Sequence, residues 1–275
     1  MSRRTVRLAA SLAAALAVAT RPVLAEDHPN QVRGFKADQV YQGMGEIDTV
    51  NLWNGNLTIT VPLGQSYKVG GRLEYGLTLV WTGNVWEVRD RFDPVQGEVT
   101  RFIPGEAFDS GLGWRLSLGQ LLLPNQPGNR NPTHAWVGPD GAEHVFFDHL
   151  HGETPVSGVF YTHDGTYLRL KTTGSNPTVE FPDGTLHTYL PGGMLKRIED
   201  RFGNSLDVTY PESGWKLADS QGRIHWVNFR TTTSSFYPKV VSSVDLAGFG
   251  GTRAVYTFTS HDFEVDRPCG GTDLE

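Results

Sequence analysis

The chain has 275 residues, with 30 acidic against 24 basic side chains and an aromatic content of 11%. Residues 1–25 hold four arginines and no acid, so the remainder carries a formal charge of −10. That charge argues against a nucleic-acid partner, because such binding surfaces are basic and clustered. The aromatic and β-branched residues recur throughout, which excludes disorder for most of the chain. The single cysteine, Cys269, excludes a disulfide within the chain.

The start of the chain is typical of a secretory signal peptide. Arginines precede a short apolar run at 8–19, and Val23 and Ala25 suit cleavage after residue 25. The run is shorter than the ~20 residues of a spanning helix, so we predict export without a membrane span. The arginine pair at 3–4 also resembles a twin-arginine signal, which leaves the export route open. Residues 26–46 lack periodicity and are predicted to form a linker or loosely ordered arm.

Residues 47–133 are predicted to form a first β region. Alternating polarity indicates a strand that starts at Leu57 and stops at Pro62. Further strands are predicted at 73–81, 85–88, 99–103 and 115–118. Residues 89–113, apart from the strand at 99–103, are rich in turn residues. A GLGW phrase at 111–114 leads into the last strand, and a polar loop follows it.

Residues 134–259 contain a repeated phrase, in which a turn is followed by a short run of alternating polarity. The turn glycines are Gly141, Gly165, Gly184, Gly203 and Gly222, so their spacings are 24, 19, 19 and 19. Glycine adopts a positive φ without steric cost, which makes an acid–glycine turn a strong hairpin signal. A fixed period near 20 indicates that each hairpin is one unit of an array.

The connections in this region are too short for helical crossovers, so the pattern predicts an all-β fold with antiparallel pairing. We expect an open, coiled ribbon of hairpins. Two more strands are predicted at 240–246 and 252–259, and a polar tail occupies 260–275.

Several phrases occur in an informative order. They are 51–57 (NLWNGNL), 73–79 (LEYGLTL), 111–118 (GLGWRLSL), 182–184 (PDG), 197–204 (RIEDRFGN) and 219–223 (DSQGR). Together they resemble the N-terminal region of Rhs/YD-repeat proteins, which are related to the shell components of insecticidal toxin complexes. The resemblance covers roughly 47–259. In the typical repeat a Tyr-Asp pair precedes the turn, and here its tyrosine is mostly missing, as in divergent early repeats.

The resemblance implies a β-ribbon that coils into a hollow shell. In complete relatives the shell continues and ends in a self-cleaving segment followed by a variable toxin. It therefore implies a chain truncated at its polar tail, whose partner is the remainder of a longer Rhs-type chain. Open strand edges invite pairing with other chains, so we also expect self-association.

Candidate catalytic and metal-binding residues are few. His144, Asp148, His149 and His151 have ligand chemistry for zinc. In a continuing strand only His149 and His151 share a face, so these two are the metal candidates. No serine lies in a GxSxG turn, and Cys269 lies near the chain end.

The acids Asp140, Asp164, Asp183 and Asp219 occupy turns, where Asp bonds nearby backbone, so turn formation explains them better than acid catalysis does. We predict no cofactor.

Three functions fit these observations. The first is a non-enzymatic structural scaffold, secreted, periplasmic or at the cell surface. The second is a carbohydrate-binding β module, since exposed aromatics stack on sugars. Trp81, Trp86, Trp136, Trp215 and Trp226 are the relevant rings, although rings in strands more often fill a core. The third is an exported all-β hydrolase.

Overall fold

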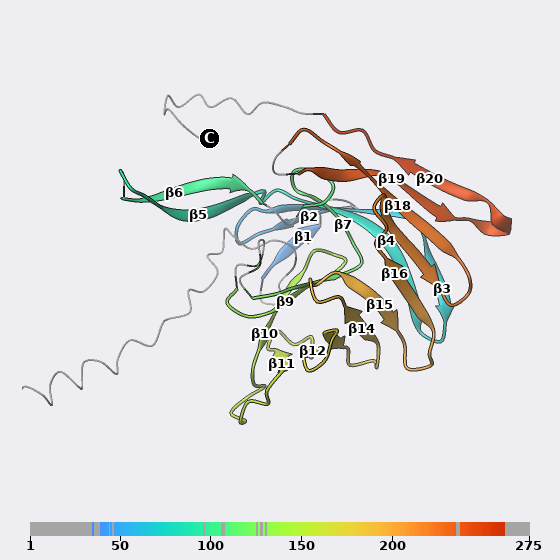
Figure 1. Ribbon diagram of the computed structural model, residues 1–275, viewed down its shortest axis with the longest axis horizontal. Helices are drawn as coiled ribbons and strands as arrows, with labels where there is room; N and C mark the ends of the chain where they lie inside the picture. The colour runs from blue at the N-terminus through green and yellow to red at the C-terminus, as the bar shows by residue number, and fades with distance from the viewer. Residues whose placement is uncertain are drawn as a thin grey trace, which may run out of the picture.

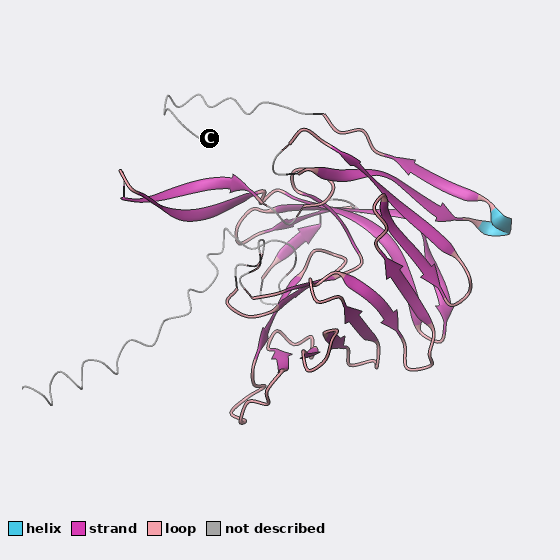
Figure 2. Ribbon diagram, in the orientation of Figure 1, coloured by secondary structure: helices cyan, strands magenta, loops and turns pink. Residues whose placement is uncertain are grey.

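The computed structural model describes residues 35, 39–43, 45, 47–95, 97–105, 108–124, 126, 129, 131–234 and 237–261. The predicted signal peptide, most of the predicted arm and tail, and Cys269 lie outside these residues. The described residues form twenty strands and one 3₁₀ turn, Phe249–Gly251, in three sheets. Every strand pairing among these residues is antiparallel and no sheet closes, which confirms the predicted all-β, open fold (Figure 2). None of the described residues belongs to a helix suited to crossing a membrane.

The first sheet has the order β1-β2-β3-β4-β7. Its strands are β1 (Tyr41–Gly43), β2 (Asp48–Asn51), β3 (Leu57–Gly70), β4 (Leu73–Thr82) and β7 (Trp114–Ser117). The long β3–β4 hairpin supplies most of its residues, and the register shifts between Leu63 and Tyr67.

The prediction that the strand starting at Leu57 stops at Pro62 is wrong. β3 continues through Pro62, which pairs with Thr78 of β4. Thr60 N donates to Ile47 O on the β2 side, at 2.7 Å. The nitrogen of Pro62, two residues on, faces the same side, where β2 no longer runs alongside. Proline is tolerated there because no ladder hydrogen bond is lost.

A separate hairpin consists of β5 (Trp86–Asp93) and β6 (Gly97–Pro104), paired along their whole length. It projects from the body of the molecule (Figure 1). Both strands are longer than predicted, and much of 89–98, which the sequence marks as turn-rich, is strand. Hydrogen bonds between paired strands satisfy the backbone N–H and C=O groups of each residue whatever its side chain. Pairing therefore continues beyond the residues that show alternating polarity.

The third sheet contains the predicted hairpin array. Its thirteen strands pair in strict sequence order from β8 to β20. They are β8 (Gln120–Leu122), β9 (Ala135–Val137), β10 (Glu143–Phe147), β11 (Val159–Thr162), β12 (Arg169–Lys171), β13 (Thr178–Glu180), β14 (Leu186–Tyr189), β15 (Leu195–Glu199), β16 (Ser205–Thr209), β17 (Gly214–Asp219), β18 (Ile224–Thr231), β19 (Lys239–Ala247) and β20 (Arg253–Thr257). Sequential pairing therefore begins before the predicted start of the repeat region.

The five predicted turn glycines all have a positive φ, between 81° and 87°. They are Gly141, Gly165, Gly184, Gly203 and Gly222, and each lies between two consecutive strands of the array. The even spacing of these glycines therefore reports consecutive antiparallel hairpins, as predicted.

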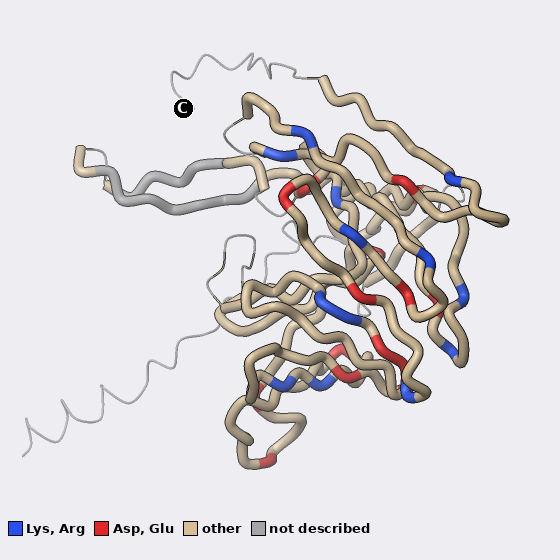
Figure 3. The backbone as a smooth tube through the Cα atoms, turned by 45° about the vertical axis from the view of Figure 1, so that its right-hand side comes forward, with Lys and Arg blue, Asp and Glu red and all other residues tan. Residues whose placement is uncertain are grey.

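The two faces of the array differ in polarity. On the inner face, directly paired residues such as Leu170 and Val179 are fully buried. They belong to one apolar cluster with Leu63 and Leu77 of the first sheet. On the outer face, Arg197 Nη1 bonds Asp207 Oδ1 across strands at 2.8 Å. Acidic and basic residues lie on neighbouring strands of the array (Figure 3). The array therefore uses one face for the core and the other for solvent.

The array curls around the β3–β4 hairpin, and its early strands approach a later turn (Figure 1). Leu121 N, on β8, donates to Gly193 O at 3.0 Å, in the turn between β14 and β15. Trp136 Nε1, on β9, donates to the Tyr189 hydroxyl of β14 at 2.6 Å. Gly193 has φ 84°, and a Cβ there would lie 1.9 Å from Leu121 O. Only glycine fits this contact. The repeated turn pattern in the sequence did not predict it.

Candidate functional site

The turn acids have local partners in the structure. In each case Oδ1 accepts a hydrogen bond from the backbone nitrogen two residues ahead. The pairs are Asp140 with Ala142 N at 3.1 Å, Asp164 with Thr166 N at 3.1 Å, Asp183 with Thr185 N at 2.9 Å and Asp219 with Gln221 N at 3.0 Å. Asp200, which was not among the predicted turn acids, does the same with Phe202 N at 2.8 Å. These carboxylates shape the turns, as the sequence pattern indicated.

The metal candidates do not lie on a strand. β10 ends at Phe147, so the assumption of a continuing strand is wrong, and His149 and His151 lie in the loop that follows. His149 Nδ1 lies 2.6 Å from Asp148 Oδ1. Across the residues that the structure describes, no group of three or more His, Cys, Asp or Glu side chains is placed to hold a metal.

His144 instead pairs with a turn acid. Its Nδ1 lies 2.6 Å from Asp164 Oδ2, and its ring stacks on Trp136 with centroids 5.4 Å apart. Burial alone would raise the pKa of Asp164, but hydrogen bonds from His144 and Thr166 lower it to about 2. This pair ties the β11–β12 turn to β10.

A polar network in the interior joins the first sheet to the array. The Tyr75 hydroxyl, on β4, lies 2.8 Å from Asp219 Oδ2 and 2.7 Å from His225 Nε2. Ala247 N donates to His225 Nδ1 at 3.1 Å, so Nδ1 is unprotonated and Nε2 carries the proton. The Tyr75 hydroxyl therefore accepts from His225 and donates to Asp219. Arg223 Nε completes the network by donating to Asp219 Oδ2 at 2.6 Å.

The network is buried and affects the ionisation of its members. His225 is fully buried, and burial lowers its pKa to about 4 although the Asp219 charge opposes this. Burial also raises the pKa of Tyr75. Each group is thus held neutral beside the Asp219–Arg223 ion pair. Sequence patterns did not indicate this network, because Tyr75 and Asp219 are 144 residues apart.

A cavity of about 400 Å³ lies between the bulged part of β3 and the turn edge of the array. His187, on β14, lines it and is buried, and burial lowers its pKa to about 3. Its Nδ1 lies 3.3 Å from the Tyr189 hydroxyl. This cavity is part of the contact between the two sheets.

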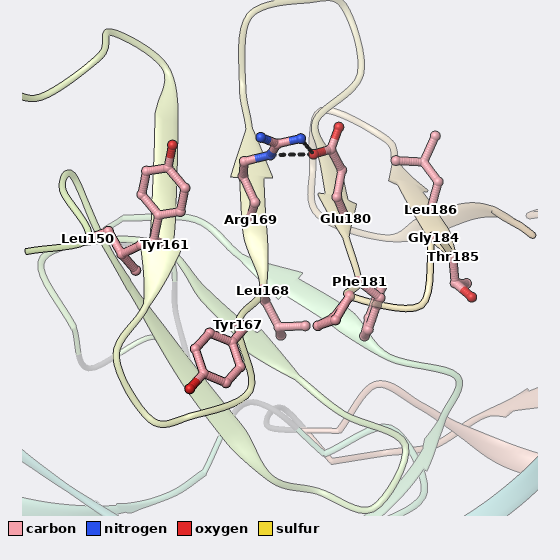
Figure 4. A pocket seen from close by; sticks show the side chains of 11 residues that line it. Leu150, Tyr161, Tyr167, Leu168, Arg169, Glu180, Phe181, Gly184, Thr185 and Leu186 are labelled. Carbon is pink, nitrogen blue, oxygen red and sulfur yellow. Dashed lines mark hydrogen bonds and ion pairs between the residues drawn. The ribbon is translucent and has the colours of Figure 1, made fainter. Parts of the chain in front are cut away.

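An open groove of about 570 Å³ crosses β11, β12, β13 and β14 (Figure 4). Tyr161, Arg169 and Glu180 are direct cross-strand neighbours, so their side chains share one face. Tyr167 and Phe181 lie on the opposite side of the groove from the Arg169–Glu180 pair (Figure 4). Tyr167 is 73% exposed.

The tryptophans are divided between the core and the surface. Trp136 is buried in the apolar cluster and Trp215 packs against it, as the core interpretation predicts. Trp86 is exposed. Trp226 lies on the outer face between buried neighbours, with Lys216 Nζ 5.6 Å from its ring. The core interpretation is therefore wrong for these last two rings.

No protein-family model matches the chain, and no curated protein compared with it matches either. The resemblance to Rhs/YD-repeat proteins rests on the order of its sequence phrases and stays a prediction.

Proposed function

We propose that the chain is a non-enzymatic structural scaffold, the N-terminal β region of an exported Rhs/YD-type protein. The supporting observation is the thirteen-strand sheet, whose strands pair in strict sequence order. A ribbon of this kind extends by adding hairpins, without rearranging those already present. Its inner face is largely apolar and its outer face carries cross-strand ion pairs, which suits a wall between two environments.

The buried polar groups also support a structural role. The Asp219 carboxylate accepts from the turn nitrogen of Arg223 and from the Arg223 side chain, and Tyr75 links it to the first sheet. Such a network specifies how the sheets dock, because any other docking leaves buried polar groups unsatisfied.

The scaffold would continue at the edge of β20. Phe258 N donates to Ser242 O at 2.9 Å and Gly248 N donates to Thr252 O at 2.7 Å, in the same register as the ladder. Alternation along β20 therefore directs the Ala254 nitrogen toward β19 and the Val255 nitrogen away from it. Val255 is 60% exposed. This row of outward groups is a template for another strand, either of a longer chain or of a second copy.

Light scattering of the chain without residues 1–25, over a range of concentrations, tests the proposal. We expect the mean mass to rise with concentration. Val255→Pro removes an outward N–H while sparing the β19 ladder, and Val255→Lys adds a charge at the edge, so both should give monomers. Val156→Lys is the control, because Val156 is 61% exposed in a loop. A wild-type chain that is monomeric throughout would contradict the proposal, as would Val255 variants that associate like wild type.

A further inference from the structure

We infer that the groove across β11 to β14 binds a neutral saccharide, through one ring face and two adjacent hydroxyls. Its volume of about 570 Å³ lies in the range of small-ligand sites, ~300–1,000 Å³. The inference goes beyond the scaffold proposal and does not rest on it, since a scaffold needs no ligand.

The groove offers apolar surface with aromatic rings at its border. Leu168 and Phe181 are part of the apolar packing, and Tyr161 and Tyr167 add two rings. The axial C–H groups of a pyranose form an apolar face that matches such rings. Tyr167 is the only non-glycine residue with a positive φ among the described residues, at 56°. A positive φ is unfavourable for tyrosine, and an exposed ring gains no stability from core packing to offset it. Contact with a ligand would account for a tyrosine at this position.

The polar groups of the groove match vicinal hydroxyls. Glu180 Oε2 accepts from Arg169, and Glu180 Oε1 accepts from Lys171 Nζ at 2.6 Å. Burial would raise the pKa of Glu180, but these two cations lower it, so the carboxylate stays ionised. A sugar hydroxyl is both donor and acceptor. One hydroxyl can donate to Glu180 while its neighbour accepts from the guanidinium of Arg169, which has five N–H groups.

The charge arrangement favours a neutral ligand over an anion. A phosphate or carboxylate that approached Arg169 would also meet the Glu180 carboxylate, since the two are bonded across neighbouring strands. Lys171, on the same strand as Arg169, bonds the other carboxylate oxygen of Glu180. A neutral polyol satisfies both polar partners without this repulsion.

The array contains an internal comparison. Arg197 pairs with Glu199 and Asp207 on the same outer face, at 2.7 and 2.8 Å. None of these three residues lines the groove. Of these two ion pairs, only the one at Arg169 lies beside a groove bordered by tyrosines. Arg197 therefore supplies a matched control.

Binding of the chain without residues 1–25 to immobilised oligomers of glucose, galactose, mannose and N-acetylglucosamine tests the inference, with oligogalacturonate as the anionic probe. We expect saturable binding to at least one neutral series. Loss of one stacking ring in Tyr167→Ala, or of the ionised acceptor in Glu180→Gln, should weaken it about tenfold. Arg197→Ala should change it by less than about twofold.

Circular dichroism of each variant confirms that the fold is kept. The inference is overturned if the wild type binds no neutral series when the immobilised sugar is present at millimolar concentration. It is also overturned if Tyr167→Ala and Glu180→Gln bind like Arg197→Ala. Binding to oligogalacturonate alone, abolished by salt, would overturn it too. None of these results alters the strand-edge measurement, so the two proposals fail separately.

Discussion

Replacing Tyr75 by phenylalanine removes one oxygen from the interior and leaves the ring in place. The lost hydroxyl donates to Asp219 at 2.8 Å and accepts from His225 at 2.7 Å. Asp219 keeps its bonds from Arg223 Nε at 2.6 Å and from turn nitrogens. His225 is fully buried, so its Nε2 proton loses its partner away from water.

The magnitude follows from these two losses. A hydrogen bond to a charged acceptor contributes about 1.5–3 kcal/mol, and a buried donor left unsatisfied costs about 1–3 kcal/mol. The two overlap, because Asp219 retains other donors. We therefore expect Tyr75→Phe to lower the free energy of unfolding by about 3 kcal/mol. For a domain of this size that is a decrease in Tm of roughly 6–12 °C.

Urea and thermal unfolding followed by circular dichroism measure this loss, with Tyr167→Phe as the control. Tyr167 is 73% exposed, so removing its hydroxyl should change stability by less than about 0.5 kcal/mol. If Tyr75→Phe also changes stability by less than about 0.5 kcal/mol, the buried network does not hold the sheets together. Equal losses of stability in both variants would contradict the reasoning as well. They would show that the loss comes from the Tyr→Phe change itself and not from the buried network.

Two further outcomes are expected. Gly193→Ala should destabilise the chain by at least about 2 kcal/mol more than Gly203→Ala, measured by urea unfolding. Both glycines have φ 84°, but a Cβ at Gly203 meets no atom within 4 Å, whereas one at Gly193 would lie 1.9 Å from a backbone oxygen of β8. Stability should also fall as pH decreases from about 6.5 toward 4, because His225 and His187 have folded pKa values of about 4 and about 3 and the unfolded state binds more protons. The slope should approach about 1.4 kcal/mol per pH unit for each histidine, and His225→Gln should reduce it, whereas an unchanged slope would exclude His225 as a source.

The hairpin array was predictable because its signals are local. An acid, a glycine three or fewer residues later and an alternating run each act over a few positions, and the five turn glycines have the positive φ that the pattern implies. The same local reasoning predicted the roles of the turn acids. It failed at Pro62, where proline is tolerated only because β2 no longer runs alongside β3.

Contacts that depend on how the sheets dock left no such signal. Gly193 is needed because β8 reaches its turn, and Tyr75 meets Asp219 across 144 residues. The groove brings together strands and a loop whose placement no short pattern describes. The sequence by itself determined the all-β ribbon, its turns and the order of its strands, because each hairpin closes within one repeat. Only the tertiary structure decided which polar residues are buried together and where a groove forms, because those depend on how far the ribbon curls and what it curls around.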